Sequence, residues 1–118
     1  MRSAIDVLRP DAAARITAYR RALDDALPGG VKAVVLFGSR ARGDASADSD
    51  YDLAVLLHGD LARHPDVRDT VADTAFEHLV AGYPLIAIAL PEDYLQPVAG
   101  HYRTELARRI AREGVLVP

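Results

Sequence analysis

The stretch FGSRARGDASADSDYDLAV, residues 37–55, decides the fold. It opens at the close of an apolar run, residues 31–37, with a glycine followed by a hydroxyl residue. It closes with two aspartates one residue apart, at the start of a second apolar run, residues 52–57. Such short apolar runs, bounded by glycine or small polar residues, predict buried strands. Between them, residues 39–42 predict a short helix capped by its first residue, and the small polar residues 43–49 predict a loop.

Three further segments have the periodicity of amphipathic helices. The first follows a capping aspartate, Asp11, and ends at the Pro28-Gly29-Gly30 turn. The second follows Asp66 and ends at Gly82, and the third is broken by Gly114. The apolar positions of the three segments, spaced by three or four, are Ala12, Ile16, Tyr19, Leu23 and Leu27; Val67, Val71, Ala75 and Leu79; and Tyr102, Leu106 and Ile110.

The remaining segments complete a mixed architecture. Residues 84–90 form a third apolar strand, residues 92–96 predict one helical turn, and residues 115–117 predict a short last strand. The order helix, strand, strand, helix, strand, helix predicts an α/β (α+β) fold, a small mixed β-sheet with helices packed mainly on one side. No linker, repeat or low-complexity segment interrupts the chain, so we expect one domain over residues 1–118.

Composition limits the function classes. The 118 residues carry 17 acids against 14 bases, a formal net charge of −3, which disfavours a broad nucleic-acid-binding surface. No cysteine is present, which excludes disulfides, thiolate nucleophiles and cysteine metal sites. No signal-peptide core is found, and no apolar run reaches the roughly 20 residues of a membrane span. We therefore expect a cytoplasmic protein without a membrane partner.

The Gly38-Ser39 turn has the residues of a phosphate site. Glycine lets an anion approach the backbone, serine can donate a hydroxyl hydrogen bond, and the first N–H groups of a following helical turn point the same way. Arg40 and Arg42 add positive charge nearby. Alone, these residues favour an ordinary strand-to-helix turn, with glycine for its geometry, serine as cap and arginine in solvent. The Gly-Lys-Ser/Thr ending of a P-loop is missing.

The aspartates Asp50 and Asp52 predict a metal site. Because residues two apart on a strand leave the same face, the two carboxylates should lie side by side. A hard cation such as Mg²⁺ relieves their repulsion, and it usually takes one or two protein carboxylates together with water and substrate phosphate oxygens. Two such ions can stabilise the attacking and the leaving oxygen of a phosphoryl displacement. Alone, the pair is also consistent with a turn cap and a solvated strand end.

Taken together, the run Gly38 to Asp44 and the run Ser49 to Leu53 resemble the signature of the nucleotidyltransferase superfamily with the DNA polymerase β fold. The small stand-alone minimal nucleotidyltransferases, the branch that includes antitoxins, are the most similar. The resemblance implies transfer of a nucleoside monophosphate from an NTP, usually ATP, to a hydroxyl, with Mg²⁺ as cofactor. It implies that Gly38, Ser39 and Arg42 bind the nucleotide, and that Asp50 and Asp52 are catalytic metal ligands.

One part of the family pattern is missing. Active members present a third carboxylate from a later strand, but the strand at residues 84–90 carries no acid. Glu92 and Asp93 follow that strand and could replace it only if the strand ends near the site. Two hypotheses therefore stay open, a nucleotidyltransferase or an inactive nucleotide- and partner-binding module. Resemblance also implies a protein partner, a HEPN-like ribonuclease toxin, and small apolar domains of this kind can form homo-oligomers.

Overall fold

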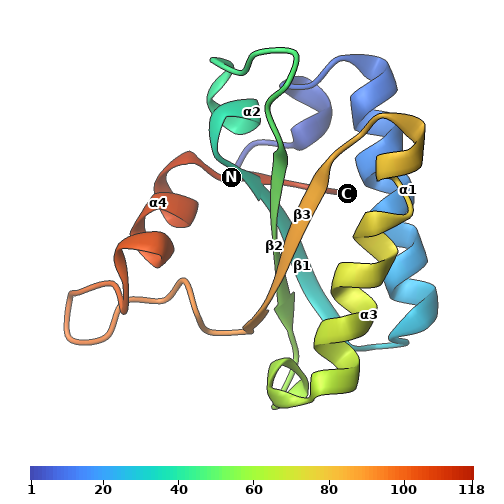
Figure 1. Cartoon of the computed structure of the whole chain (residues 1–118). Coiled ribbons are helices and arrows are strands. Elements are labelled where there is room, and N and C mark those ends of the chain that lie inside the picture. The colour runs from blue at the N-terminus through green and yellow to red at the C-terminus, as the bar shows by residue number, and fades with distance from the viewer.

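A computed structural model describes residues 1–118 and contains a four-stranded sheet in the order β3-β2-β1-β4 (Figure 1). β2 lies antiparallel to β1 and parallel to β3, and β4 lies antiparallel to β1. The strands are β1 (Val31–Phe37), β2 (Tyr51–Leu57), β3 (Leu85–Pro91) and β4 (Val115–Leu116). The mixed sheet that the element order predicted is confirmed.

The helices cover the sheet unequally. α1 (Pro10–Ala26) and α3 (Pro65–Phe76) cover one face, α4 (Glu105–Glu113) lies on the other, and the short α2 (Ser39–Arg42) stands at one end of the sheet (Figure 1). Because side chains alternate along a strand, Leu36 packs in the large core under α1 and α3, whereas its neighbour Phe37 packs in a small cluster with α4. Most of the helical cover therefore lies on one side, as expected.

The ends of the first two helices differ from the sequence-based prediction. α1 begins at Pro10, not after a capping Asp11, because proline is well suited to the first helical position. Instead, the Asp11 carboxylate accepts a 2.7 Å hydrogen bond from the Tyr83 hydroxyl. α3 ends at Phe76, and a 3₁₀ turn, Leu79–Ala81, carries the chain to Gly82. The four-residue repeat therefore does not extend to the turn, where His78 is buried.

The last helix and the turn before it also differ in detail. α4 begins after Thr104, whose Oγ1 accepts the Ala107 N–H at 3.0 Å, so Tyr102 lies outside the helix. This hydroxyl cap stops the helix from extending back towards Tyr102. Residues 92–96 form hydrogen-bonded turns but no helix. No helix in the structure is long and apolar enough to cross a membrane.

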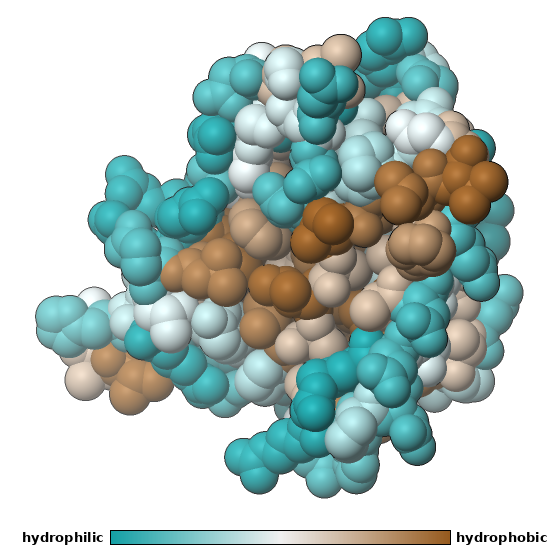
Figure 2. Space-filling model, viewed as in Figure 1, coloured by the Kyte–Doolittle hydropathy of each residue, from teal (hydrophilic) through white to brown (hydrophobic).

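Apolar side chains gather at the open edge of the sheet. β3 is the outer strand there, and Figure 2 shows apolar surface across the middle of the molecule, in the region of β3 in Figure 1. Phe76 at the end of α3, Leu79 and Val80 in the following turn, and Ile86 on β3 are all exposed. Ile86 is 51% exposed and stands directly beside Asp52 in the strand register, so the apolar edge reaches the predicted metal site.

Candidate functional site

The glycine of the predicted phosphate turn lies against the predicted metal ligand. Phe37 pairs with Asp52, so Gly38 leaves the end of β1 beside that carboxylate. Its backbone, at φ 77° and ψ −161°, is in a region that is essentially restricted to glycine. A Cβ atom on Gly38 would also collide with Asp52 Oδ2. Glycine is therefore needed here for its backbone conformation and because it leaves room for the Asp52 carboxylate.

The predicted short helix is present as α2, but its N-cap is Gly38 and no side chain caps it, so the predicted serine cap is wrong. Ser39 is half-buried, and its Oγ atom makes no hydrogen bond within the protein. The first N–H groups of a helix have no intrahelical partner. Ser39 thus offers donors to an anion at the place that the sequence indicated.

Arg42 is held by two carboxylates. Its Nε donates to Asp44 at 3.2 Å, and its Nη1 donates to Glu113 at 3.0 Å. These hydrogen bonds, first that to Asp44 and then that to Glu113, raise the pKa of the guanidinium above its ordinary value. Only Nη2 has no partner, so a phosphate would meet an arginine that is already fixed in place.

The two aspartates lie close together at the same end of the sheet. Asp52 is the second residue of β2 and is half-buried on the α4 side, whereas Asp50 is exposed just ahead of the strand. Burial raises the pKa of Asp52, and the negative charge of Asp50 raises it further. A nearby cation would lower the electrostatic cost of ionising both groups. The two carboxylates therefore interact electrostatically, and their joint role as metal ligands stays a prediction.

Two residues of α4 complete the surroundings of Asp52, and sequence reasoning missed both. The charges of Arg109 and Glu113 act on Asp52 in opposite directions, Arg109 lowering its pKa and Glu113 raising it. Glu113 Oε1 accepts the Gly38 N–H at 2.9 Å and lies 3.6 Å from Arg109 Nη2. The arginine-rich helix looked like a solvated surface in the sequence. No local signal placed its last turn over a glycine 75 residues earlier.

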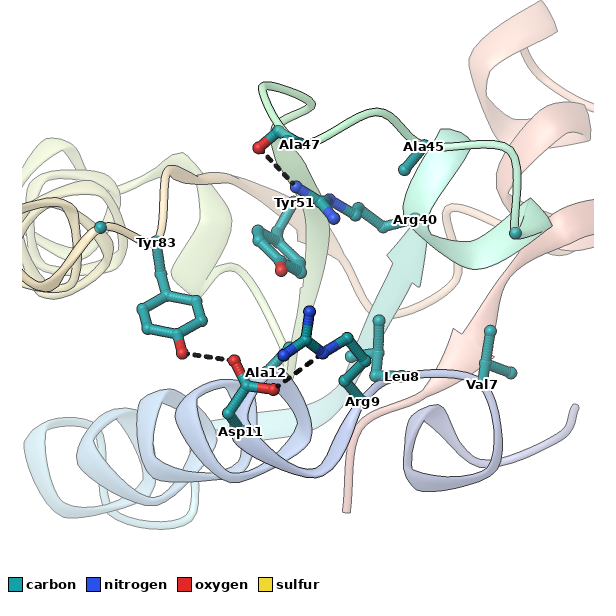
Figure 3. Close-up of a pocket in the computed structure, with 12 residues that line it drawn as sticks. Val7, Leu8, Arg9, Asp11, Ala12, Arg40, Ala45, Ala47, Tyr51 and Tyr83 are labelled. Carbon is teal, nitrogen blue, oxygen red and sulfur yellow. Dashed lines mark hydrogen bonds and ion pairs between the residues drawn. The ribbon is translucent and has the colours of Figure 1, made fainter.

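The Arg40 side chain binds the loop that precedes Asp50. Its Nη2 donates to the backbone oxygens of Ser49 at 2.9 Å and Ala47 at 3.3 Å, and its guanidinium lies 4.3 Å from the ring centre of Tyr51. Figure 3 shows Arg40 against Tyr51 in the wall of a cavity of about 320 Å³, which Tyr83 also lines. That Arg40 also adds positive charge near the phosphate turn stays a prediction. Its hydrogen bonds stabilise the loop at residues 43–50, which connects the glycine-serine turn to Asp52.

The later strand does not supply a third acid. Because β3 runs parallel to β2, Asp52 pairs with Ile86, while Leu57 pairs with the last β3 residue at the opposite end. Glu92 follows that far end, where its carboxylate meets His58 Nδ1 at 2.7 Å. Asp93 binds Arg103 instead. Neither acid reaches back to the site, and no group of three potential metal-ligating side chains forms anywhere in the structure.

The arrangement defines a class of protein, a mixed α+β fold with a glycine-serine turn facing an acidic strand. Residues 27–117 match the family model described as polymerase beta, nucleotidyltransferase. The chain belongs to this family. A crystal structure of a candidate nucleotidyltransferase from Sulfolobus solfataricus has a similar fold, with a TM-score of 0.55 at 20% identity over 98% of this chain and 86% of that one. A search of curated proteins finds no match.

Proposed function

We propose that this protein transfers a nucleoside monophosphate, AMP from ATP, to a hydroxyl group on a protein or small molecule. The observation that carries the proposal is the contact between Gly38 and Asp52, which joins the phosphate turn to the acidic pair. In this proposal Ser39 and Arg42 bind the triphosphate. Asp50 and Asp52 hold Mg²⁺, a donor set that suits an ion completing its shell with water and phosphate oxygens. The bound metal would supply charge neutralisation at the transferring phosphate.

The reaction forms one bond and breaks one. The acceptor oxygen attacks the α-phosphorus, the bond from the α-phosphorus to the bridging oxygen breaks, and pyrophosphate leaves. The acceptor proton passes to Asp52 or to water, because Ile86 stands where the strand neighbour of Asp52 would otherwise offer a base. Arg42, fixed by Asp44 and Glu113, offers its free Nη2 to charge that develops on the phosphate oxygens.

A second function is favoured by the same Ile86. With two carboxylates and no third acid, the site can hold a metal-nucleotide as a ligand without turning it over. The protein would then act as a binding module for its partner. In both cases we propose a cytoplasmic protein whose partner is a HEPN-like toxin, a role supported by the resemblance of residues 38–53 to minimal nucleotidyltransferases.

Transfer of label separates the two functions. The protein is incubated with Mg²⁺ and ATP labelled on the α-phosphate, with and without the product of the neighbouring gene, and ATP labelled on the γ-phosphate serves as a control. We expect α-label, and no γ-label, on the acceptor, lost in Asp52→Asn. Glu92→Gln is the matched control, because it neutralises an acid at the other end of the same strand pair. Absence of transfer, with nucleotide still bound and the partner still neutralised by Asp52→Asn, would refute the enzymatic proposal.

A gain-of-function variant tests the binding-module alternative. Ile86→Asp places a carboxylate beside Asp52 at a half-exposed position, so the substitution should disturb the core little. If the missing acid limits the chemistry, transfer should rise by roughly 100-fold, the low end of a general base's contribution. Val80→Asp, at an even more exposed apolar position in a 3₁₀ turn outside the strands, should leave transfer unchanged. No gain in Ile86→Asp would show that the absent carboxylate is not what limits this site.

A further inference from the structure

A single carboxylate on α4 connects the two parts of the phosphate turn. Glu113 Oε1 accepts the backbone N–H of Gly38 at 2.9 Å, and Oε2 accepts Arg42 Nη1 at 3.0 Å. The two bonded groups are the first and last members of the predicted nucleotide-binding set, and they flank Ser39. We propose that Glu113 is a positioning residue, which fixes the Gly38 amide and the Arg42 guanidinium so that Ser39 and Arg42 present their free donors together. This inference rests on the proposed nucleotide site.

The surrounding packing holds the carboxylate in place. Gly114, the next residue, lies so close to Ile110 and Val35 that it has no room for a side chain. Val115 then pairs with Leu36 of β1, the strand that leads into the phosphate turn. The Glu113 side chain is only 16% exposed. The end of α4 is therefore packed against the same strand that leads to Gly38. The two hydrogen bonds of Glu113, to Gly38 and to Arg42, form a preorganised bridge and are not a mobile surface ion pair.

The bridge determines which donors a phosphate can use. The Gly38 N–H is already occupied by Glu113, and the Ala41 and Arg42 amides donate to Gly38 O. An incoming phosphate therefore has to use the Ser39 hydroxyl and amide, the Arg40 amide and Arg42 Nη2. With Arg42 Nε on Asp44 and Nη1 on Glu113, the plane of the guanidinium is fixed from two sides. A planar group held in this way loses less rotational freedom when it binds phosphate.

A purely structural role does not explain the choice of a carboxylate. Glu113 places a third negative charge near Asp50 and Asp52, and like charges at close range oppose ionisation. The neighbouring cations Arg42 and Arg109 offset that repulsion. An uncharged acceptor could cap the Gly38 amide without this cost, but it would hold the arginine less firmly.

Two substitutions separate the parts of the bridge. Glu113→Ala removes both bonds, whereas Glu113→Gln keeps an acceptor for the Gly38 amide and loses the charge that holds Arg42. Glu105→Ala is the matched control, because it removes an exposed acid of the same helix that pairs with Arg108 outside the site. The measurements are hydrogen exchange of the Gly38 amide, thermal stability, the Kd for Mg·ATP, and KM and kcat for transfer.

We expect Glu113→Ala to raise the Kd and the KM for Mg·ATP roughly tenfold, in line with the loss of charged hydrogen bonds, and to speed exchange of the Gly38 amide. Glu113→Gln should restore the amide protection but only part of the affinity, and Glu105→Ala should change neither. Unchanged Kd in Glu113→Ala would overturn the inference while leaving the proposed function intact. Tighter binding would also overturn it, because the carboxylate would then be competing with phosphate.

Hydrogen exchange of the Gly38 amide is measured without nucleotide. It therefore distinguishes failure of the Glu113 inference from failure of the proposed function. A wild-type protein that binds no Mg·ATP would refute the proposed function by itself. If the Gly38 amide also stayed protected in Glu113→Ala, the bridge would have no positioning effect on the turn, and the inference would fail on its own evidence.

Discussion

Replacing Gly38 with alanine tests the contact on which the candidate site depends. The backbone of Gly38 lies at φ 77° and ψ −161°, where other residues are strained by roughly 1–3 kcal/mol. The new methyl group would also meet Asp52 Oδ2, and forcing extra atoms into packed space typically costs about 1–3 kcal/mol more. We therefore expect Gly38→Ala to lower the free energy of unfolding by about 2–6 kcal/mol.

A matched variant isolates the collision. Gly82 also has a positive φ, 88°, but a Cβ atom there would have no neighbour within 4 Å. Gly82→Ala should therefore cost only the strain of a left-handed residue, roughly 1–2 kcal/mol. Urea denaturation of the two variants, with the slope of the transition checked for two-state behaviour, measures the difference directly.

A double substitution makes the argument refutable. Asp52→Ala removes the carboxylate that the new methyl group would strike, so Gly38→Ala should cost less in that background, with a coupling of about 1–2 kcal/mol. Equal losses in Gly38→Ala and Gly82→Ala, together with additivity in the double variant, would show that Gly38 does not make the close approach described here.

Three further perturbations test the rest of the structure. Tyr19→Phe removes the buried 2.9 Å bond from the Tyr19 hydroxyl to Val71 O and should cost about 1 kcal/mol in urea denaturation; no loss would mean that α1 and α3 are held by packing alone. Burial lowers the pKa of His78 below 6.5, so the unfolded chain takes up this proton first, and stability should fall as the pH drops through and below that value. His78→Phe should weaken the dependence of the free energy of unfolding on pH, measured by denaturation at several values from pH 7 to 5. An unchanged pH dependence would mean that other groups cause it. Arg40→Lys should speed amide exchange in residues 43–50 roughly tenfold, because lysine cannot reproduce the guanidinium bonds to the loop; equal exchange rates would contradict that role.

Much of the site could be predicted because its parts lie close together in the chain. Gly38 follows β1 and Asp52 is near the start of the neighbouring antiparallel strand β2, so a connection of 13 residues brings them into contact almost regardless of the rest of the fold. Asp50 lies just ahead of that strand, separated from Asp52 by one residue, so its charge acts on Asp52 as well. Apolar periodicity likewise identified the three main helices, although their ends depended on caps and turns that the pattern did not show.

What the sequence left open depends on strand direction and long-range packing. Whether Glu92 could replace the missing acid depended on β3 running parallel to β2, which puts Ile86 beside Asp52 and Glu92 at the opposite end. The contacts of Arg40 with the Tyr51 ring and with Ser49 O likewise depended on how the chain folds. Neither the position of Glu92 nor the contacts of Arg40 can be predicted from residue spacing. Both depend on which segments the completed sheet brings together.

By itself, the sequence determined the family-defining pair of motifs and the strands that carry them, since those signals act over a few residues. Only the tertiary structure decided the surroundings that control the chemistry. Glu113 reaches Gly38 because α4 packs across β1 and β4 returns the chain beside it, a contact that spans 75 residues. The buried Ile110 and the closely packed Gly114 hold α4 in the position that allows this contact. Both packing interactions exist only once the whole sheet has formed.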